Sequence, residues 1–150
     1  MLYNCYNIAK SGGDVDEYFK QIEARYNEII EGLGMDLDLT EEFNKVKQGI
    51  KHNAGKDFSA SRGEYLNGII LANYIGYDFI DAEDGIFFKE NGTLDTEKTN
   101  EELTAILANH EHAVIPGFYG VMPNGTIKTF SRGGSDITGS IVARAIKADI

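Results

Sequence analysis

The sequence is poor in cysteine, in basic residues and in long apolar runs. Its single cysteine, Cys5, excludes an internal disulfide and fits a reducing compartment, so we expect a cytoplasmic protein. The 14 Lys and Arg residues are outnumbered by 24 Asp and Glu residues, giving a net charge of −10. That charge argues against non-specific binding to nucleic acid or to an anionic membrane surface.

No segment has the character of a membrane anchor or a leader. The most apolar window, residues 66–80, is interrupted by Asn67, Asn73 and Asp78, and it is too short and too polar to span a bilayer. The chain does not open with a charged and then apolar leader before a small-residue cleavage site, so we expect no signal peptide. We therefore predict no association with membranes.

Several ligand-binding patterns are also missing. The sequence contains no Walker phosphate loop, no Gly-x-Gly-x-x-Gly dinucleotide fingerprint and no Gly-x-Ser-x-Gly nucleophile elbow. His110 and His112 are two residues apart and would share one face of a strand, as metal ligands can, but no third ligand is evident near them. We predict no metal site in this chain.

What is present is enough for a folded domain with a core. The 150 residues are 42% hydrophobic and include 8 tyrosines and 8 phenylalanines. There is no internal repeat, low-complexity tract or interdomain linker. Residues 1–150 are therefore expected to form a single domain.

The first third of the chain has the spacing of helices. Residues 1–10 are predicted to be helical, and Asp14 with Glu17 forms a capping-box-like start for a second helix. Apolar residues then recur at helical intervals: Val15, Tyr18, Phe19, Ile22, Tyr26, Ile29, Ile30 and Leu33. Another helix is expected to begin at Thr40. We interpret residues 14–51, approximately, as a helical excursion on the outside of an α/β sheet.

Helices and strands alternate along the rest of the chain. In order, we predict a helix at about 59–75, strands at 77–82 and 85–88, a turn at 89–92, a helix opened by a capping box of Thr99 and Glu102, a strand at 113–117, a turn at 122–126 between antiparallel strands, a strand at 126–130 and a helix at 137–147. This alternation predicts an α/β fold, with a layered and mostly parallel sheet flanked by helices.

A glycine-rich turn stands between the last predicted strand and the last predicted helix. It contains Arg132, Gly133, Gly134, Ser135 and Asp136. Glycines let backbone approach a ligand closely, and the N-terminus of the following helix offers unpaired N–H groups that suit an anion. Arg132 adds a forked donor for a carboxylate or phosphate. Ser135 or Asp136 is equally compatible with a plain helix N-cap, which leaves Arg132 unexplained.

A second candidate residue, Glu64, follows Arg62 and Gly63 near the start of the predicted helix at 59–75. Glycine inside a helix costs about 1 kcal/mol relative to alanine, so Gly63 suggests a close approach by another group. Glu64 itself is also consistent with an acid that complements the helix dipole in its first turns. The residue pattern alone leaves both interpretations open.

Several of these segments resemble the aspartate kinases of the amino acid kinase superfamily. The run from Phe130 to Asp136 (FSRGGSD), followed by Ile-Thr-Gly, is similar to the signature loop of that family. Residues 61–64 (SRGE) resemble its substrate-side helix, and residues 79–82 (FIDA) and 114–120 (VIPGFYG) resemble its core strands. The resemblance implies an amino acid kinase-like α/β fold and extends over essentially the whole chain.

The resemblance also implies a reaction and a role for each residue. Aspartate kinases transfer the γ-phosphoryl group of ATP, with Mg²⁺, to the side-chain carboxylate of L-aspartate. By this resemblance, Arg132 would clamp the substrate α-carboxylate and Glu64 would bind its ammonium group. Three residues, Gly133, Gly134 and Ser135, would bring donors to the reacting carboxylate or phosphate. Asp136 would be catalytic, by orienting a lysine that neutralises the phosphates.

The chain also departs from the family pattern. The Lys-Phe-Gly-Gly-Ser opening with its catalytic lysine, the Trp-Thr-Asp nucleotide segment and the C-terminal regulatory domains are absent from these 150 residues, and Ser131 stands where many relatives have glycine. We therefore expect a central segment with an incomplete fold that does not turn over alone. Unpaired sheet edges would favour self-association, so a homo-oligomer is expected.

Two other functions are compatible with the same residues. One is a different amino acid kinase that acts on another acid, although Arg132 and Glu64 together favour a substrate with both an α-carboxylate and an α-amine. The other is a non-catalytic amino-acid-binding or interaction module, which the absent lysine and nucleotide segment would favour.

Overall fold

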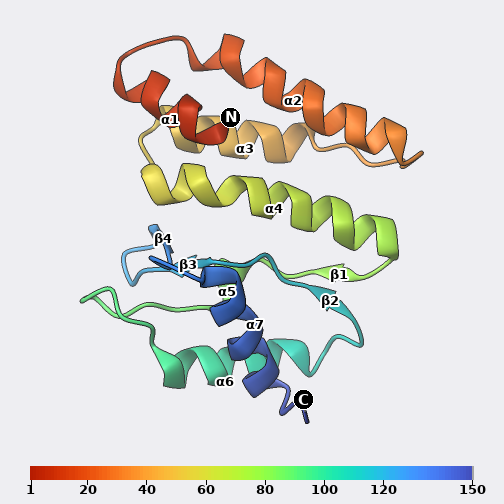
Figure 1. Ribbon diagram of the computed structural model, residues 1–150, viewed down its shortest axis with the longest axis vertical. Coiled ribbons are helices and arrows are strands. Elements are labelled where there is room, and N and C mark those ends of the chain that lie inside the picture. Colours follow the sequence, from red (N-terminus) through yellow and green to blue (C-terminus); the bar gives the residue numbers. More distant parts are fainter. Residues whose placement is uncertain (150) are drawn as a thin grey trace.

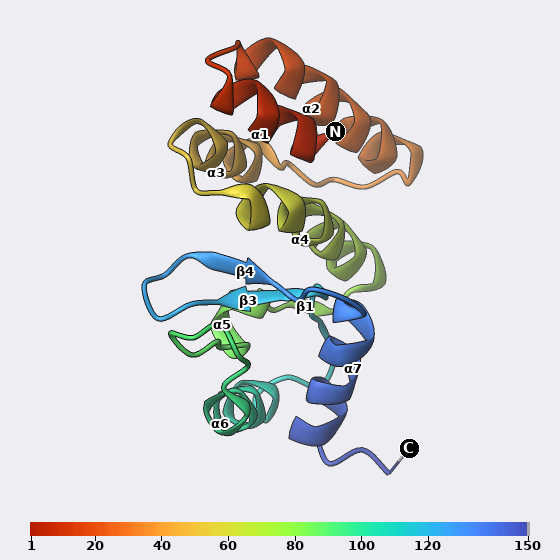
Figure 2. The same ribbon diagram turned by 60° about the vertical axis from the view of Figure 1, so that its left-hand side comes forward.

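Helix α4 divides the molecule into two parts. The computed structural model describes residues 1–149. In chain order, the elements are α1 (Leu2–Lys10), α2 (Val15–Gly32), α3 (Thr40–Lys51), α4 (Lys56–Ile75), β1 (Asp78–Phe79), α5 (Ala82–Gly85), α6 (Thr96–Leu107), β2 (Ala113–Val114), β3 (Tyr119–Val121), β4 (Ile127–Thr129) and α7 (Gly134–Ala145). Figures 1 and 2 show α1, α2 and α3 on one side of α4, and the strands with α5, α6 and α7 on the other.

The helices before α4 begin where the sequence predicts. Asp14 caps α2, because its side chain accepts hydrogen bonds from the backbone N–H groups of Asp16 and Glu17 at 2.9 and 3.4 Å. Helix α3 starts at Thr40, whose N–H and hydroxyl both donate to the Asp38 carboxylate. No helix among residues 1–149 is long and apolar enough to cross a membrane. That residues 14–51 form an excursion from a single domain stays a prediction.

The first core joins these helices to α4. Its fully buried side chains include Phe19 and Ile22 of α2, Ile50 of α3 and Leu66 of α4. The rings of Phe19 and Phe43 meet edge to face, with centroids 6.5 Å apart. Burying one such side chain contributes about 1.5–3 kcal/mol, so this cluster fixes α4 against the helical layer.

The sheet is built from two short pairs of strands. Strands β1 and β2 are parallel, with Asp78 opposite Ala113, and β3 and β4 are antiparallel, with Tyr119 opposite Thr129. A parallel bridge between Phe87 and Val121 connects the segment after α5 to β3. A second core lies between these strands and helices α6 and α7, and it contains Ala82, Ile86, Leu103, Tyr119, Ile127 and Ala145.

The strands predicted at 77–82 and 113–117 are shorter than expected, since only β1 and β2 form there, and no regular strand forms at 85–88. The strand predicted at 77–82 is limited to β1, because Asp81 leaves the extended run to cap α5 through the N–H of Glu83 at 3.2 Å. The strand predicted at 85–88 is likewise not a regular strand. Gly85 ends α5, and the residues that follow make only isolated bridges. The prediction for 85–88 was wrong because the local acid-capped turn forms a short helix.

The capping box predicted at Thr99 was also wrong. Helix α6 begins at Thr96 and is capped by Asp95, whose carboxylate accepts from the N–H of Lys98 at 3.3 Å. Thr99 lies inside the helix, buried, and its hydroxyl accepts a hydrogen bond from the N–H of Phe87 at 2.9 Å. Its hydroxyl therefore satisfies the backbone of a neighbouring segment instead of the end of its own helix.

A buried arginine lies where α4 meets the sheet. Arg62 is 4% exposed, and its guanidinium carbon lies 4.8, 4.6 and 5.0 Å from the ring centroids of Phe58, Tyr65 and Tyr119 respectively. A cation over an aromatic face is attracted by the ring quadrupole, and more strongly when it is desolvated. Because Tyr119 belongs to β3, this arrangement joins the two parts of the molecule.

Asp81 supplies the negative charge that this arginine needs. Its Oδ2 atom lies 4.0 Å from Arg62 Nη1, and its Oδ1 atom accepts a hydrogen bond of 2.6 Å from the hydroxyl of Tyr119. Burial, followed by the charge of Asp81, raises the pKa of Tyr119, so the phenol remains a donor. A buried charge without a partner is costly, which makes Asp81 a structural requirement of this contact.

We expect Asp81→Asn to lower the free energy of unfolding by about 3 kcal/mol, because it leaves the buried Arg62 charge unpaired. Asparagine keeps an acceptor for the N–H of Glu83 and for Tyr119, so the change isolates the charge. Chemical denaturation measures the effect. The matched control is Asp84→Asn, an exposed acid on the same helix, for which we expect a change within about 0.5 kcal/mol. Equal effects of the two variants would mean that the aromatic rings alone hold Arg62.

Candidate functional site

The glycine-rich turn between β4 and α7 differs from its predicted form in its N-cap residue and in where the helix begins. Helix α7 is preceded by Gly133, which has φ 60° and ψ 27° and occupies the N-cap position. Glycine adopts this left-handed conformation without the penalty that a side chain would bring. Ser135 and Asp136 therefore lie in the first turn of α7, and the N-cap interpretation of these two residues was wrong. The helix also begins earlier than predicted, at Gly134 instead of Ile137.

The first turn of α7 presents free backbone donors. The first hydrogen bond of this turn runs from the N–H of Ile137 to the carbonyl of Gly133 at 3.0 Å. Within residues 1–149, the N–H groups of Gly134, Ser135 and Asp136 have no hydrogen-bond acceptor. These groups and the helix dipole give this end of α7 a partial positive charge, which suits an anionic ligand.

The turn fits closely against the loop between β2 and β3. A Cβ atom on Gly134 would lie 2.5 Å from Cβ of Phe118, and one on Gly117 would lie 3.2 Å from Oγ of Ser135. Two glycines from segments far apart in the sequence thus allow the turn and the loop to pass each other. Gly134 was predicted for its donor role, whereas the structure also requires it for packing.

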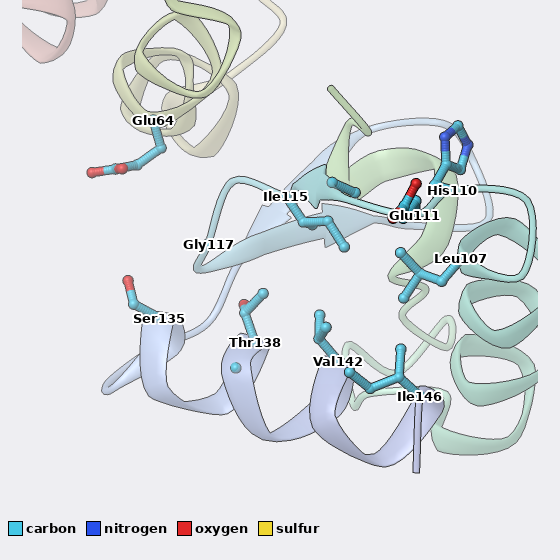
Figure 3. Close-up of a pocket in the computed structure, with 12 residues that line it drawn as sticks. Glu64, Leu107, His110, Glu111, Ile115, Gly117, Ser135, Thr138, Val142 and Ile146 are labelled. Carbon is cyan, nitrogen blue, oxygen red and sulfur yellow. The ribbon is translucent and has the colours of Figure 1, made fainter. Parts of the chain in front are cut away.

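A pocket of about 560 Å³ opens beside this contact. It is lined by Glu64, Leu107, His110, Glu111, Ala113, Ile115, Gly117, Ser135, Thr138, Gly139, Val142 and Ile146. Figure 3 shows Glu64 on α4 and Ser135 on α7 at the same end, on either side of Gly117. Toward the other end lie Leu107, Val142 and Ile146, together with His110 and Glu111. Glu64 and Ser135, one of the three residues with a free N–H group, therefore border one cavity, which suits a ligand with both a cationic and an anionic group.

Helix α2 supports the turn of α4 that carries Glu64. The hydroxyl of Tyr26 donates a 3.2 Å hydrogen bond to the carbonyl of Gly63. Burial, and then the negative charge of Glu64, raise the pKa of Tyr26, so this donor stays protonated. Gly63 itself has ordinary contacts, since a Cβ atom there would lie 3.7 Å from Leu2. The close approach inferred for Gly63 is therefore absent, and it occurs instead at Gly68, where a Cβ atom would lie 2.9 Å from the ring of Phe79.

The other predicted site residues lie outside this pocket. Arg132 is exposed in the turn and is not part of the pocket lining. Asp136 is also exposed and borders a shallow hollow with Ile137, Ser140, Ile141 and Arg144. The structure thus brings Glu64 and Ser135 together beside Gly133 and Gly134, and leaves Arg132 and Asp136 at the surface. The roles assigned to all six residues stay predictions.

Three further residues at the site lie in segments that resemble the family but were assigned no role from the sequence. Gly117 and Phe118 belong to the loop that packs on the turn, and Thr138 is a buried polar residue of α7.

At the opposite end of the pocket, His110 Nδ1 lies 2.7 Å from Asp78 Oδ2, which ties the end of α6 to the start of β1. Within the part of the chain that the structure describes, no three His, Cys, Asp or Glu side chains are grouped to hold a metal ion.

The fold and the sequence place the chain in a known family. The sequence model of the amino acid kinase family matches residues 11–150, so the chain belongs to the amino acid kinase family. The predicted α/β fold of this type is confirmed by a solved structure, the Clostridium acetobutylicum aspartate kinase. That structure superposes with a TM-score of 0.93 and 48% sequence identity, and the match covers 99% of this chain and 34% of the other.

Aspartate kinases also stand among the other relatives. Aspartokinase 3 of Bacillus subtilis (strain 168) is 27% identical over 164 residues, which cover all of this chain and 36% of the relative. Aspartokinase III of E. coli, solved in complex with lysine and aspartate, has a TM-score of 0.70 at 18% identity, a likeness of fold alone. The predicted resemblance to aspartate kinases is confirmed, and the chain spans about a third of the length of these relatives.

We expect Gly134→Ala to lower the free energy of unfolding by about 1–3 kcal/mol, because the new Cβ atom would lie 2.8 Å from the backbone of Phe118 and force the turn and the loop apart. Thermal or chemical denaturation measures this. The matched control is Gly139→Ala on the same helix, where a Cβ atom has no neighbour within 4 Å. Alanine favours a helix over glycine by about 1 kcal/mol, so the control should be neutral or stabilising. A neutral Gly134→Ala would contradict the close packing of the turn.

Proposed function

We propose that the chain is the amino-acid-binding part of an aspartate kinase. The complete protein would transfer the γ-phosphoryl group of ATP to the side-chain carboxylate of L-aspartate, the first step in making lysine, threonine and methionine. The observation that carries this proposal is the meeting of Glu64 and the N-terminus of α7 at one pocket. The 48% identity to the Clostridium acetobutylicum aspartate kinase supports the choice of substrate within the family.

In this proposal the two ends of the substrate backbone are bound by opposite charges. Glu64 binds the ammonium group from the side of α4. Arg132 leaves its exposed position and clamps the α-carboxylate with its forked donors, as long surface side chains do when a ligand orders them. The N–H groups of Gly134 and Ser135 then face the reacting carboxylate, where negative charge must be stabilised.

The phosphoryl donor is proposed to bind on the same side of α7. Aspartokinase III of E. coli has been solved in complex with aspartate and ADP, and its fold, with a TM-score of 0.65, is shared with this chain. Asp136 would orient a lysine from elsewhere in the protein toward the phosphates. Mg²⁺ would enter with ATP, since it is usually held by one or two carboxylates together with substrate phosphates.

Transfer of a phosphoryl group depends on position and charge more than on covalent chemistry. The turn before α7 supplies both, because its glycines fix its position and Ser135 borders the pocket. A pre-formed donor set costs little reorganisation when the negative charge develops. The chain thus contributes the substrate side of the reaction.

A second candidate is an amino-acid-binding module without catalysis. The exposed positions of Arg132 and Asp136, both outside the pocket lining, favour it over an assembled catalytic centre in this chain. The two proposals share the pocket and differ in whether binding leads to transfer. If a protein as long as the aspartate kinase relatives binds L-aspartate but forms no acyl phosphate from ATP, the second proposal is favoured.

We expect Arg132→Ala to weaken L-aspartate binding by about tenfold or more, because the α-carboxylate loses a charge-assisted hydrogen-bond partner. Titration calorimetry on the chain measures the affinity. Arg144→Ala is the matched control, since Arg144 is an exposed arginine in the last turn of the same helix and lies outside the pocket. An unchanged affinity in Arg132→Ala, or an equal loss in Arg144→Ala, would contradict the clamp.

A further inference from the structure

One residue beside the pocket has an unusual backbone. Phe118, in the loop between β2 and β3, has φ 65°, in the left-handed region. Residues with a bulky side chain rarely adopt this conformation, and it persists where neighbouring groups hold it. Such positions cluster at functional sites, where the surrounding structure holds the strained residue in place.

The backbone of Phe118 is held on both sides by the glycine-rich turn. The carbonyl of Phe118 accepts a 2.9 Å hydrogen bond from the N–H of Phe130, where the turn begins. The N–H of Phe118 donates to the hydroxyl of Thr138 at 3.0 Å, one turn into α7. The segment from Phe130 to Thr138 therefore binds both backbone groups of one residue in the neighbouring loop.

The hydroxyl of Thr138 links three parts of the site. Its side chain is only 4% exposed, and besides accepting from Phe118 it donates to the carbonyl of Gly134 at 2.9 Å. One hydroxyl thus connects the strained loop with the first turn of α7, which carries Ser135. Because Gly134 packs directly on Phe118, a movement of Phe118 must displace this first turn.

We propose that Thr138 is a positioning residue for ligand binding. Its hydroxyl holds Phe118 in the left-handed conformation, and Phe118 in turn fixes the place of Ser135 and the free N–H groups beside the pocket. Thr138 also lines the pocket, but its role is to set the position of the donors. The link to an amino acid ligand rests on the proposed function, whereas the link between Thr138 and the donors does not.

Three variants of the 150-residue chain test this proposal. Thr138→Val keeps the shape of the side chain and removes the hydroxyl, and Thr138→Ser restores the hydroxyl. Phe118→Gly removes the strain, because glycine adopts a positive φ freely. Amide proton–nitrogen spectra report the positions of residues 133–136, and titration with L-aspartate reports the affinity.

We expect Thr138→Val to shift the amide signals of residues 133–136 and to weaken L-aspartate binding by about tenfold, the effect of one lost buried hydrogen bond, and Thr138→Ser to recover both. In a Phe118→Gly background, Thr138→Val should have a smaller effect on both measurements, because the hydroxyl no longer has strain to hold.

The proposal is overturned if Thr138→Val lowers the melting temperature but leaves the signals of residues 133–136 and the affinity unchanged, which is the result for a purely structural threonine. An effect of Thr138→Val that is equal with and without Phe118→Gly also overturns it. If the wild-type chain binds no L-aspartate, the proposed function fails, while the amide signals still decide the role of Thr138.

Discussion

The buried charge of Arg62 is the constraint on which the arrangement of this molecule depends. A guanidinium at 4% exposure is stable only where an acid and polarisable groups surround it. Phe58 and Tyr65 provide two aromatic rings from α4 itself, whereas Asp81 and Tyr119 provide the acid and a third ring from the sheet side. Helix α4 can therefore take only one position on the sheet. Glu64, two residues further along α4 than Arg62, is held in place together with the helix.

The other half of the site is fixed by close packing rather than by charge. The turn before α7 and the loop before β3 pass each other at Gly134 and Gly117, and the space that side chains would need is already filled. The donors at the start of α7 thus have a defined direction before any ligand arrives. Arg62 holds α4 and this contact holds α7, so Glu64 and Ser135 line one pocket from two separately supported helices.

Sequence patterns predicted the features that local chemistry decides. Asp14 caps α2 because the carboxylate and the N–H groups it binds are neighbours in the chain. The capping box at Thr99 has the same appearance, but there the hydroxyl is bound to Phe87, which no local pattern reveals. The prediction of an N-cap at Ser135 or Asp136 was wrong because Gly133, in a left-handed conformation, occupies the N-cap position. Glu64 and the turn were associated through family resemblance alone, since their meeting depends on tertiary contacts such as that of Arg62.

The central claim is that Glu64 and the N-terminus of α7 recognise the two charged ends of one amino acid. The most direct test compares amide spectra of the chain titrated with L-aspartate and with succinate, which carries both carboxylates of aspartate but lacks its ammonium group. We predict that L-aspartate shifts the signals of both Glu64 and Ser135, and that succinate binds about tenfold more weakly or worse, because it leaves Glu64 without a partner. Equal binding of the two ligands, or shifts that leave Glu64 unaffected, would contradict the claim.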